Sequence, residues 1–166
     1  MASFVKPFFS ASLFLVFAAC SDTTAPISLS LNRALWEKQN LHDYSYIGRR
    51  DCFCGDAGQD VYVVVLSDTV FQVRVVGTNV ELPKGYWLTV GQLFDYAERS
   101  FGEKDKTVKV EYDPALSYPT LVDVQCPMVA DCGVTIRARN LGGLVVAFDR
   151  TRDLSIKAYD VGVKSR

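Results

Sequence analysis

Four of the five cysteines are the residues of this chain best suited to chemistry, and they fall into two pairs. Cys52 and Cys54 are two residues apart, so on a strand both thiols would point to the same side. Two thiolates on one side can bind a soft ion such as Cu(I) or Zn²⁺. Cys126, Met128 and Cys132 could add three more sulfur atoms, although neither spacing is a strong metal signature.

The same four cysteines can instead be structural. Their number is even once Cys20 is set aside, and in an exported protein this favours disulfides over free thiols. Cys126 and Cys132 could close a loop between adjacent strands, and Cys52 could pair with Cys54 in a small, more easily reduced ring. Cross-pairing between the two sites is the other possibility. We expect structural disulfides at all four positions, with no bound metal and no cofactor.

No convincing catalytic set accompanies these cysteines. His42 is the only histidine, and its place beside Asp43 at the end of a predicted helix is an ordinary one for a histidine. Gly142-Gly143 lacks the helix and lysine that follow in a phosphate-binding loop. Six acidic residues could supply an acid–base pair, but their surroundings are typical of solvent faces and turn caps: Asp95, Glu98, Glu111, Asp113, Asp123 and Asp131. The sequence therefore predicts a protein that is not an enzyme.

The N-terminus indicates export. A short basic start, an uncharged run over Phe8–Ala19 and small residues before Cys20 are typical of a secretory signal. The small residues directly before Cys20 resemble the bacterial lipoprotein processing site, at which the cysteine is acylated and the leader is removed; Phe17 departs from its usual Leu. The alternative is a plain leader that is cut nearby, with Cys20 an ordinary cysteine.

The uncharged run is too short to be a retained anchor, because a spanning helix needs about 20 apolar residues. We expect acyl chains on Cys20, such as palmitate, to hold the protein on a membrane of the bacterial cell envelope. Ser21 stands where an Asp would resemble an inner-membrane retention signal, which leaves the outer membrane open if the cell is Gram-negative.

Composition limits the other partners. The net charge is −1 at pH 7, and 49% of the residues are hydrophobic, which is enough for the core of one domain. Arg49-Arg50 is too small a cluster to form a basic patch, so we expect no nucleic-acid partner.

Two helices are predicted. The first begins with Ser30 as N-cap, ends near Asp43 and has Trp36 beside a narrow apolar stripe of Leu31, Ala34, Leu35 and Leu41. The second follows a capping box of Thr89 and Gln92, and Gly102 can close it in a left-handed conformation. Its apolar face consists of Val90, Leu93, Phe94, Ala97 and Phe101.

Six strands alternate or run apolar in the manner of a sheet, at residues 44–50, 61–66, 69–76, 107–112, 120–125 and 134–139. Ser67-Asp68 is a plausible tight turn between two of them, and Leu144–Phe148 can add a seventh strand. Short loops between successive strands require antiparallel pairing.

The predicted fold is therefore α+β, with a single antiparallel sheet of about six or seven strands and two helices packed on one face. A helix followed by three strands occurs twice, which suggests a possible duplication. The expected organisation is a signal peptide at 1–19, a lipidated tether at 20–29, one domain at 30–149 and a C-terminal tail at 150–166.

A family resemblance extends over about residues 34–140. It is carried at the start by Trp36, Asp43-Tyr44-Ser45-Tyr46, Cys52-Phe53-Cys54 and the Val61–Val65 run. Further on it is carried by Thr89–Asp95, Val110–Pro114, Tyr118-Pro119 and Asp123. These segments resemble the domain-of-unknown-function family 6174, whose uncharacterised members often have a lipoprotein leader. Asp131, followed here by Cys132-Gly133, departs from the acidic pair of that family. The resemblance supports the predicted fold and the predicted location in the cell envelope, and it supplies no catalytic residue.

The sequence thus predicts an anchored envelope protein that binds an unknown protein or small molecule. The free face of the sheet and the loops at 77–88 and 113–119 are the candidate surfaces. Six aromatic residues could take part, although most are more typical of a core: Tyr44, Tyr46, Tyr86, Trp87, Tyr112 and Tyr118. The alternative is thiol-based metal handling or redox chemistry at Cys52 and Cys54, with Cys126 and Cys132.

Overall fold

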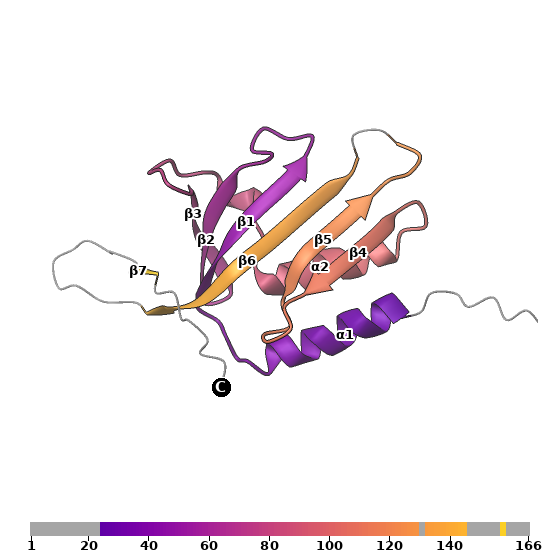
Figure 1. Ribbon diagram of the computed structural model, residues 1–166, viewed down its shortest axis with the longest axis horizontal. Helices are drawn as coiled ribbons and strands as arrows, with labels where there is room; N and C mark the ends of the chain where they lie inside the picture. Colours follow the sequence, from indigo (N-terminus) through magenta and orange to yellow (C-terminus); the bar gives the residue numbers. More distant parts are fainter. Residues whose placement is uncertain (1–23, 130–131, 146–156, 159–166) are drawn as a thin grey trace, which may run out of the picture.

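A computed structural model describes residues 24–129, 132–145 and 157–158, which form two helices and one antiparallel sheet (Figure 1). The predicted signal peptide, Cys20 and nearly all of the predicted tail lie outside the described residues. Within the described part of the chain, no helix combines the length and the apolar character that crossing a membrane requires.

The elements follow the predicted order, and the α+β fold is confirmed. The helices are α1 (Thr24–Glu37) and α2 (Val90–Phe101), with a short 3₁₀ helix η1 (Lys84–Tyr86) before α2. The strands are β1 (Tyr44–Cys52), β2 (Asp60–Leu66), β3 (Thr69–Val75), β4 (Thr107–Tyr112), β5 (Pro119–Gln125), β6 (Val134–Val145) and the two-residue β7 (Lys157–Ala158).

Six strands form the main sheet in the order β3-β2-β1-β6-β5-β4, and β7 pairs with the end of β6. Both helices cover the same face, where alternate strand residues are buried in one core with Leu93 and Phe94 of α2. Strand alternation supplies this face, because every second side chain points to it. Its largest strand contributions come from Tyr44, Tyr46, Val61, Val63, Val65, Val73, Val122 and Val124.

The turn between β2 and β3 is the predicted one. Ser67 and Asp68 have φ angles of 47° and 58°. Two consecutive residues with positive φ give the tight turn whose twist matches that of the flanking strands. The Ser67 amide also donates to Asp43 Oδ1 over 2.7 Å, which ties the turn to the start of β1.

The start of α2 is confirmed and its end is corrected. The Gln92 amide donates to Thr89 Oγ1 at 3.2 Å, and the Thr89 amide donates to Gln92 Oε1 at 2.9 Å, which is the predicted capping box. Gly102 does not close the helix in a left-handed conformation: its φ is −75° and ψ −13°. The chain continues in a right-handed turn, so α2 ends without using the freedom of glycine.

The first helix differs from its prediction at both ends. It begins at Thr24, not Ser30, so residues 24–29 of the expected tether are helical and Leu29 already belongs to the core. Pro26 does not prevent this, because proline is tolerated in the first helical turn. The helix ends at Glu37, well before Asp43, and Asn40 follows with a φ of 52°.

The predicted apolar stripe of α1 is also wrong. Leu31 is 59% exposed and Leu35 is 37% exposed, whereas Leu29 and Trp36 are buried. Trp36 decides the rotation of the helix, because its ring packs edge-on against Tyr44 at a centroid distance of 5.5 Å and buries the larger area. In the sequence, the polar Asn32 between Leu29 and Trp36 interrupts the apolar pattern of this inner face. In the structure, the side-chain amide of Asn32 donates to the Ser28 carbonyl within the helix, at 2.8 Å.

The last apolar run is not a separate strand. Leu144 and Val145 continue β6 beyond Asn140, whose φ of 53° accompanies a register shift against β1. The rest of the predicted strand, through Phe148, lies outside the described residues.

The topology gives the possible duplication no support. One unit would consist of α1 with β1, β2 and β3, and the other of α2 with β4, β5 and β6. Across the sheet the strands occur as β3-β2-β1 and then as β6-β5-β4, so the order within the two units is the same. Three antiparallel steps separate β1 from β4, so these strands run in opposite directions. A rotation that matched both order and direction would turn the sheet over, yet α1 and α2 lie together on one face.

Candidate functional site

The best candidate site is a hollow of about 500 Å³ at the end of β1, which we call the Arg50 pocket. Three segments form its walls: the end of β1, which contributes Arg50, the loop that follows Cys52, and the segment that leads into η1. The lining residues are Arg50, Cys54, Gly55, Asp56, Leu82, Pro83 and Tyr86. Part of the 77–88 loop that was expected to bind a ligand therefore lines this pocket.

Arg50 is the charged group in the wall of the pocket. Its side chain is only 14% exposed, and its guanidinium carbon lies 5.6 Å from the ring centroid of Tyr86 and 5.7 Å from that of Trp87. Such cation–π contacts gain strength when water is excluded. Nη1 lies 3.4 Å from Asp56 Oδ2, which is a long ion pair, and Nη2 lies 3.8 Å from Cys52 Sγ. The guanidinium thus keeps donor capacity for a ligand.

Trp87 is positioned for this contact by a glycine. A Cβ added at Gly48 would meet Trp87 Cζ3 at 2.9 Å and Tyr46 Cε2 at 3.1 Å, so the indole lies directly against the backbone of β1. Arg50 follows two residues later on the same side of the strand. The absence of a side chain at Gly48 therefore allows the ring on which Arg50 rests to lie close to the sheet.

The four cysteines form two separate local disulfides. Cys52 is bonded to Cys54, with Cα atoms 5.3 Å apart, and Cys126 to Cys132, with Cα atoms 5.8 Å apart. Within the described residues, Cys52, Cys54 and Asp56 are the group close enough to share a metal ion, with ligand atoms within 4.8 Å of one another. The second cysteine pair is not part of this group, so the four sulfurs do not form one tetrahedral site.

His42 is exposed and does not cap the end of α1. Its Nδ1 lies 2.6 Å from Asp68 Oδ2, and its Nε2 lies 3.2 Å from Asn40 Oδ1. The adjoining hollow, about 310 Å³, has Thr89 and Asp68 in its wall and is lined by no serine or cysteine. The Thr89 hydroxyl accepts the Gln92 amide as part of the α2 cap. This hollow therefore offers His42 no serine or cysteine nucleophile, and its carboxylates are those of Glu37 and Asp68.

The acidic candidates have structural partners. Asp95 and Glu98 bind Arg33 at 2.8 and 3.1 Å, and Glu111 binds Lys109 at 2.7 Å. Asp113 accepts two turn amides, and Asp123 accepts Gln125 and Thr135. Asp131 lies outside the described residues. These contacts are those of surface ion pairs and turn caps.

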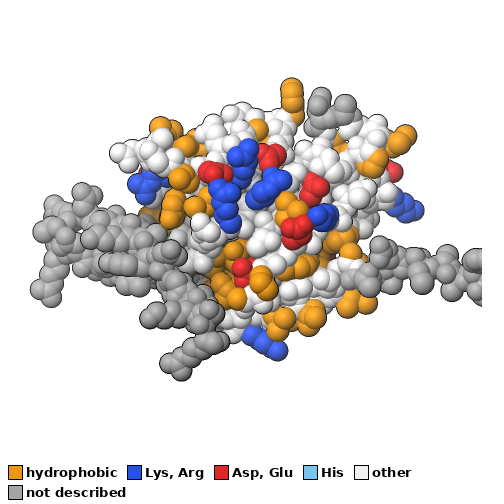
Figure 2. Space-filling model, viewed as in Figure 1, with side chains coloured by type: hydrophobic (Ala, Val, Ile, Leu, Met, Phe, Trp, Pro, Cys, Tyr) orange, Lys and Arg blue, Asp and Glu red, His pale blue; other side chains and the backbone are white. Residues whose placement is uncertain are grey.

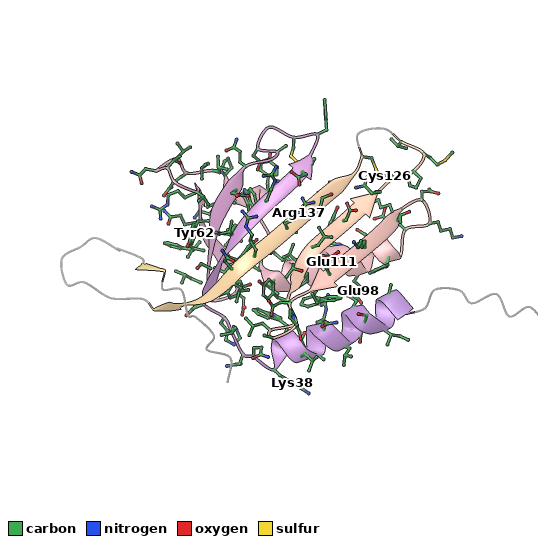
Figure 3. The ribbon with its side chains drawn as sticks, in the orientation of Figure 1. Lys38, Tyr62, Glu98, Glu111, Cys126 and Arg137 are labelled. Atoms are coloured by element: carbon green, nitrogen blue, oxygen red, sulfur yellow. A yellow bond between two sulfur atoms is a disulfide. The ribbon has the colours of Figure 1, made fainter. Side chains whose placement is uncertain are left out.

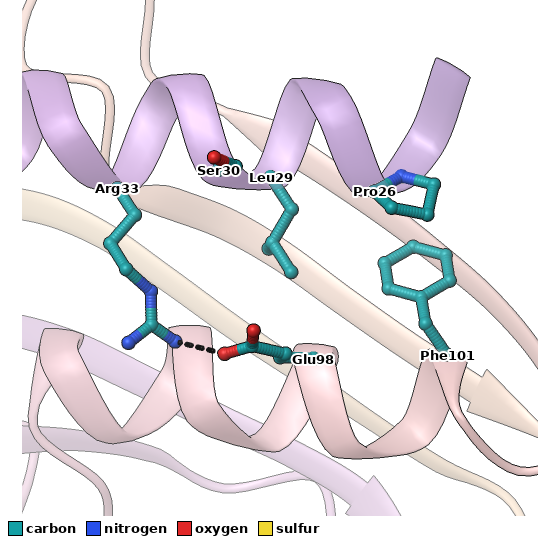
Figure 4. A pocket seen from close by; sticks show the side chains of 6 residues that line it. All are labelled: Pro26, Leu29, Ser30, Arg33, Glu98 and Phe101. Carbon is teal, nitrogen blue, oxygen red and sulfur yellow. Dashed lines mark hydrogen bonds and ion pairs between the residues drawn. The ribbon is translucent and has the colours of Figure 1, made fainter. Parts of the chain in front are cut away.

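The hollow between the helices is lined by Pro26, Leu29, Ser30, Arg33, Glu98 and Phe101 and has a volume of about 250 Å³ (Figure 4). The charges at its edge, Arg33 and Glu98, bind each other across α1 and α2. Arg33 also lies over the Phe94 ring at 5.5 Å. We interpret these contacts as the helix–helix interface.

The face of the sheet without helices carries a central group of charges (Figure 2). Arg49 Nε lies 3.1 Å from Asp51 Oδ1, and Arg137, labelled in Figure 3, pairs with the other oxygen of Asp51. Arg139 pairs with Asp60. Each of these arginines has an acidic partner, so this group of charges lacks a free cation for a ligand. Asp60 Oδ1 is buried without a hydrogen-bond partner among the described residues, and Arg49 Nη1 lies 3.9 Å from it.

The aromatic residues are mostly core, as expected. Tyr44, Tyr46, Trp87 and Tyr118 are buried, and Tyr86 is exposed at the Arg50 pocket. Burial raises the pKa of the Tyr44 hydroxyl to about 12, with a smaller opposing effect from its hydrogen bond with the Val90 amide. Burial, and next the neighbouring Tyr44, raise the pKa of Tyr46 further above its ordinary range.

Sequence reasoning missed Arg50 and Asp56. Arg49-Arg50 was treated as one small cluster, but the two side chains lie on opposite faces of β1. Strand alternation was the available signal. Arg50 lies on the same side of β1 as Tyr44, Tyr46 and Gly48, all of which are buried. An arginine on the core side of a strand needs a partner, which Asp56 and the two rings supply.

Comparison with known proteins gives one match. No curated protein and no solved structure matches the chain significantly. Residues 28–142 match the model of a family of unknown function, DUF6174. This match covers more than half of the chain, including both helices' inner faces, the Arg50 pocket and both disulfides, and the chain therefore belongs to the DUF6174 family.

Proposed function

We propose that this protein is a non-enzymatic lipoprotein of the bacterial cell envelope that binds a small amphipathic anion in the Arg50 pocket. The leader and Cys20 support the anchor, which would lie in the outer membrane if the cell is Gram-negative. The internally satisfied contacts of His42 and of the acidic residues support binding without catalysis.

The observation that carries the proposal is a largely buried arginine beside an open, mostly apolar hollow. Arg50 is held by two aromatic rings and one long ion pair. A ligand with a carboxylate, sulfonate or phosphate group can take up the remaining donors of the guanidinium. Leu82, Pro83 and Tyr86 provide apolar surface for the rest of such a ligand.

Fluorescence of 8-anilinonaphthalene-1-sulfonate tests the pocket, because this probe joins an aromatic body to one anionic group. We expect saturable binding to the wild-type protein, and a dissociation constant roughly 10- to 100-fold higher for Arg50→Met, since a charged hydrogen bond contributes about 1.5–3 kcal/mol. Arg50→Lys should recover only part of the loss, because an ammonium cannot reproduce the guanidinium fork. N-phenyl-1-naphthylamine, which lacks the sulfonate, should bind weakly to all three proteins.

Arg49→Met is the matched control, because Arg49 precedes Arg50 but lies on the opposite face of the sheet. Tyr86→Ala is a second test of the pocket in case Arg50→Met does not fold, because the exposed Tyr86 ring can be removed without opening the core. Equal affinities of wild type, Arg50→Met and Tyr86→Ala for the sulfonate probe would contradict the pocket assignment.

A thiol-based function is the second candidate, because Cys52, Cys54 and Asp56 lie close enough to share an ion. Two features weigh against it: the sulfurs are joined to each other, and the cationic Arg50 already lies beside Asp56 and Cys52. We expect no titratable thiol in the denatured, unreduced mature protein and no metal by elemental analysis. Free thiols with stoichiometric zinc or copper would favour this second function over the first.

A further inference from the structure

We infer that the outer face of α1 lies on the bilayer that carries the lipid anchor, an inference that rests on the proposed acylation of Cys20. The surface consists of Ile27, Leu31 and Leu35, which we call the outer stripe. The occupant of this surface is a lipid membrane, and a second copy of the chain is the competing possibility.

The outer stripe is a continuous apolar row that the described part of the chain leaves exposed. Its members are four residues apart and therefore lie above one another on the helix. They are 67%, 59% and 37% exposed, in chain order. Leu29 and Trp36 fill the opposite side of α1, so no rotation of the helix could bury both rows. Figure 2 shows hydrophobic side chains along this rim of the molecule.

The surroundings of the stripe match those of a helix that lies in a membrane interface. Such helices have one apolar face and polar or charged flanks. Ser30 and Glu37 flank the stripe, and Lys38 follows its last turn; Figure 3 shows Lys38 pointing away from the sheet. The aliphatic stem of a lysine can lie along apolar surface while its ammonium reaches the head groups.

Covalent geometry brings this helix, rather than another part of the domain, to the membrane. Thr24 begins α1 only four residues after Cys20. Four extended residues span at most about 14 Å, so acyl chains on Cys20 hold the first turn of α1 close to the head groups. Ile27 lies in that turn, and Leu31 and Leu35 continue the same side of the helix.

This orientation keeps the Arg50 pocket in water. Trp36 of α1 contacts Tyr44 at the start of β1, and Arg50 lies six residues further along that strand, about 20 Å away. Figure 1 shows α1 along one rim of the molecule and the end of β1 at the opposite rim. The anchor and the proposed ligand pocket would therefore lie at opposite sides of the domain.

Quenching by brominated phosphatidylcholine tests the inference. In vesicles that carry the acylated full-length protein, a Leu31→Trp variant should lose emission intensity and shift to the blue. Phe53→Trp is the matched control and should change little, because Phe53 follows the last residue of β1 and is 86% exposed in the wild type. The natural Trp36 and Trp87 are buried and give a constant background. Quenching of Leu31→Trp no stronger than that of Phe53→Trp would overturn the inference.

A second experiment tests the docking surface separately from the acylation of Cys20. Intact mass of the envelope protein reports whether Cys20 is acylated. If it is not, the proposed lipoprotein function fails, and the same variants of residues 21–166 are held on vesicles through an N-terminal hexahistidine tag and a nickel-chelating lipid. Quenching of Leu31→Trp in this experiment supports the docking surface by itself. A lipid-free dimer that Ile27→Ser/Leu31→Ser dissociates would assign the stripe to a second copy and overturn the membrane proposal.

Discussion

A Trp36→Ala variant is expected to lose about 3–5 kcal/mol of unfolding free energy, the usual cost of removing a buried indole. Trp36 is 7% exposed and packs edge-on against Tyr44 at 5.5 Å and Tyr118 at 6.3 Å. It therefore joins α1 to the start of β1 and to the residue before β5. Urea unfolding followed by far-ultraviolet circular dichroism measures the loss.

Leu31→Ala is the control for this prediction, because it removes a large side chain from the same helix. Leu31 is 59% exposed, and substitutions at such positions usually change stability by no more than about 0.5 kcal/mol. The comparison is made without lipid, so that the outer stripe has no membrane to contact. A loss at Leu31 as large as that at Trp36 would mean that α1 packs with the face that the sequence pattern first indicated.

Trp36 also explains why the buried face of α2 could be predicted from sequence while that of α1 could not. In α2 the apolar positions form one row, and Thr89 and Gln92 mark its start. In α1 the sequence offers two rows, one through Leu31 and Leu35 and one through Leu29 and Trp36. Local periodicity cannot choose between them, because the choice depends on the cavity that Tyr44 and Tyr118 leave for a single large ring.

The candidate site was predictable only in its parts. The 77–88 loop was named as a binding surface, and the local disulfide of Cys52 with Cys54 was one of the pairings considered. Arg50 was not identified, since its role depends on β1 ending beside Tyr86, which lies 36 residues away in the chain. Contacts between such distant segments follow from strand order, and a single sequence does not specify that order.

The buried tyrosines of β1 connect the sheet to the start of α2. The Val90 amide donates to the Tyr44 hydroxyl at 2.8 Å, and the Tyr46 hydroxyl donates to the Leu88 carbonyl. Val90 is the first residue of α2, so its amide has no partner within the helix. Tyr44 thus supplies a second cap beside that of Thr89. Both tyrosines are buried, and burial favours the neutral form of each hydroxyl.

The folded protein is therefore expected to lose stability steeply in alkali. The pKa of Tyr44 is raised by burial from 10.0 to about 12, so its contribution is complete below pH 10 and is lost as the pH rises through about 12. Two pKa units correspond to about 2.7 kcal/mol. Tyr46 acts in the same direction, because burial raises its pKa as well, and its ionised oxygen could no longer donate to Leu88.

Urea unfolding at a series of pH values above 9 measures this effect, with Tyr44→Phe as the informative variant. Below pH 10 the variant should be less stable than wild type by about 1 kcal/mol, since the Val90 amide loses its acceptor. Above pH 10 its stability should fall less steeply, because one buried hydroxyl no longer ionises on unfolding. The two curves should cross, because the alkaline loss of about 2.7 kcal/mol through Tyr44 in the wild type exceeds the initial deficit of about 1 kcal/mol in the variant. Tyr86→Phe, at an exposed ring, should follow the wild-type curve. Parallel curves for wild type and Tyr44→Phe would show that Tyr44 does not couple ionisation to folding, and the alkaline loss would then have to arise at Tyr46 or elsewhere in the core.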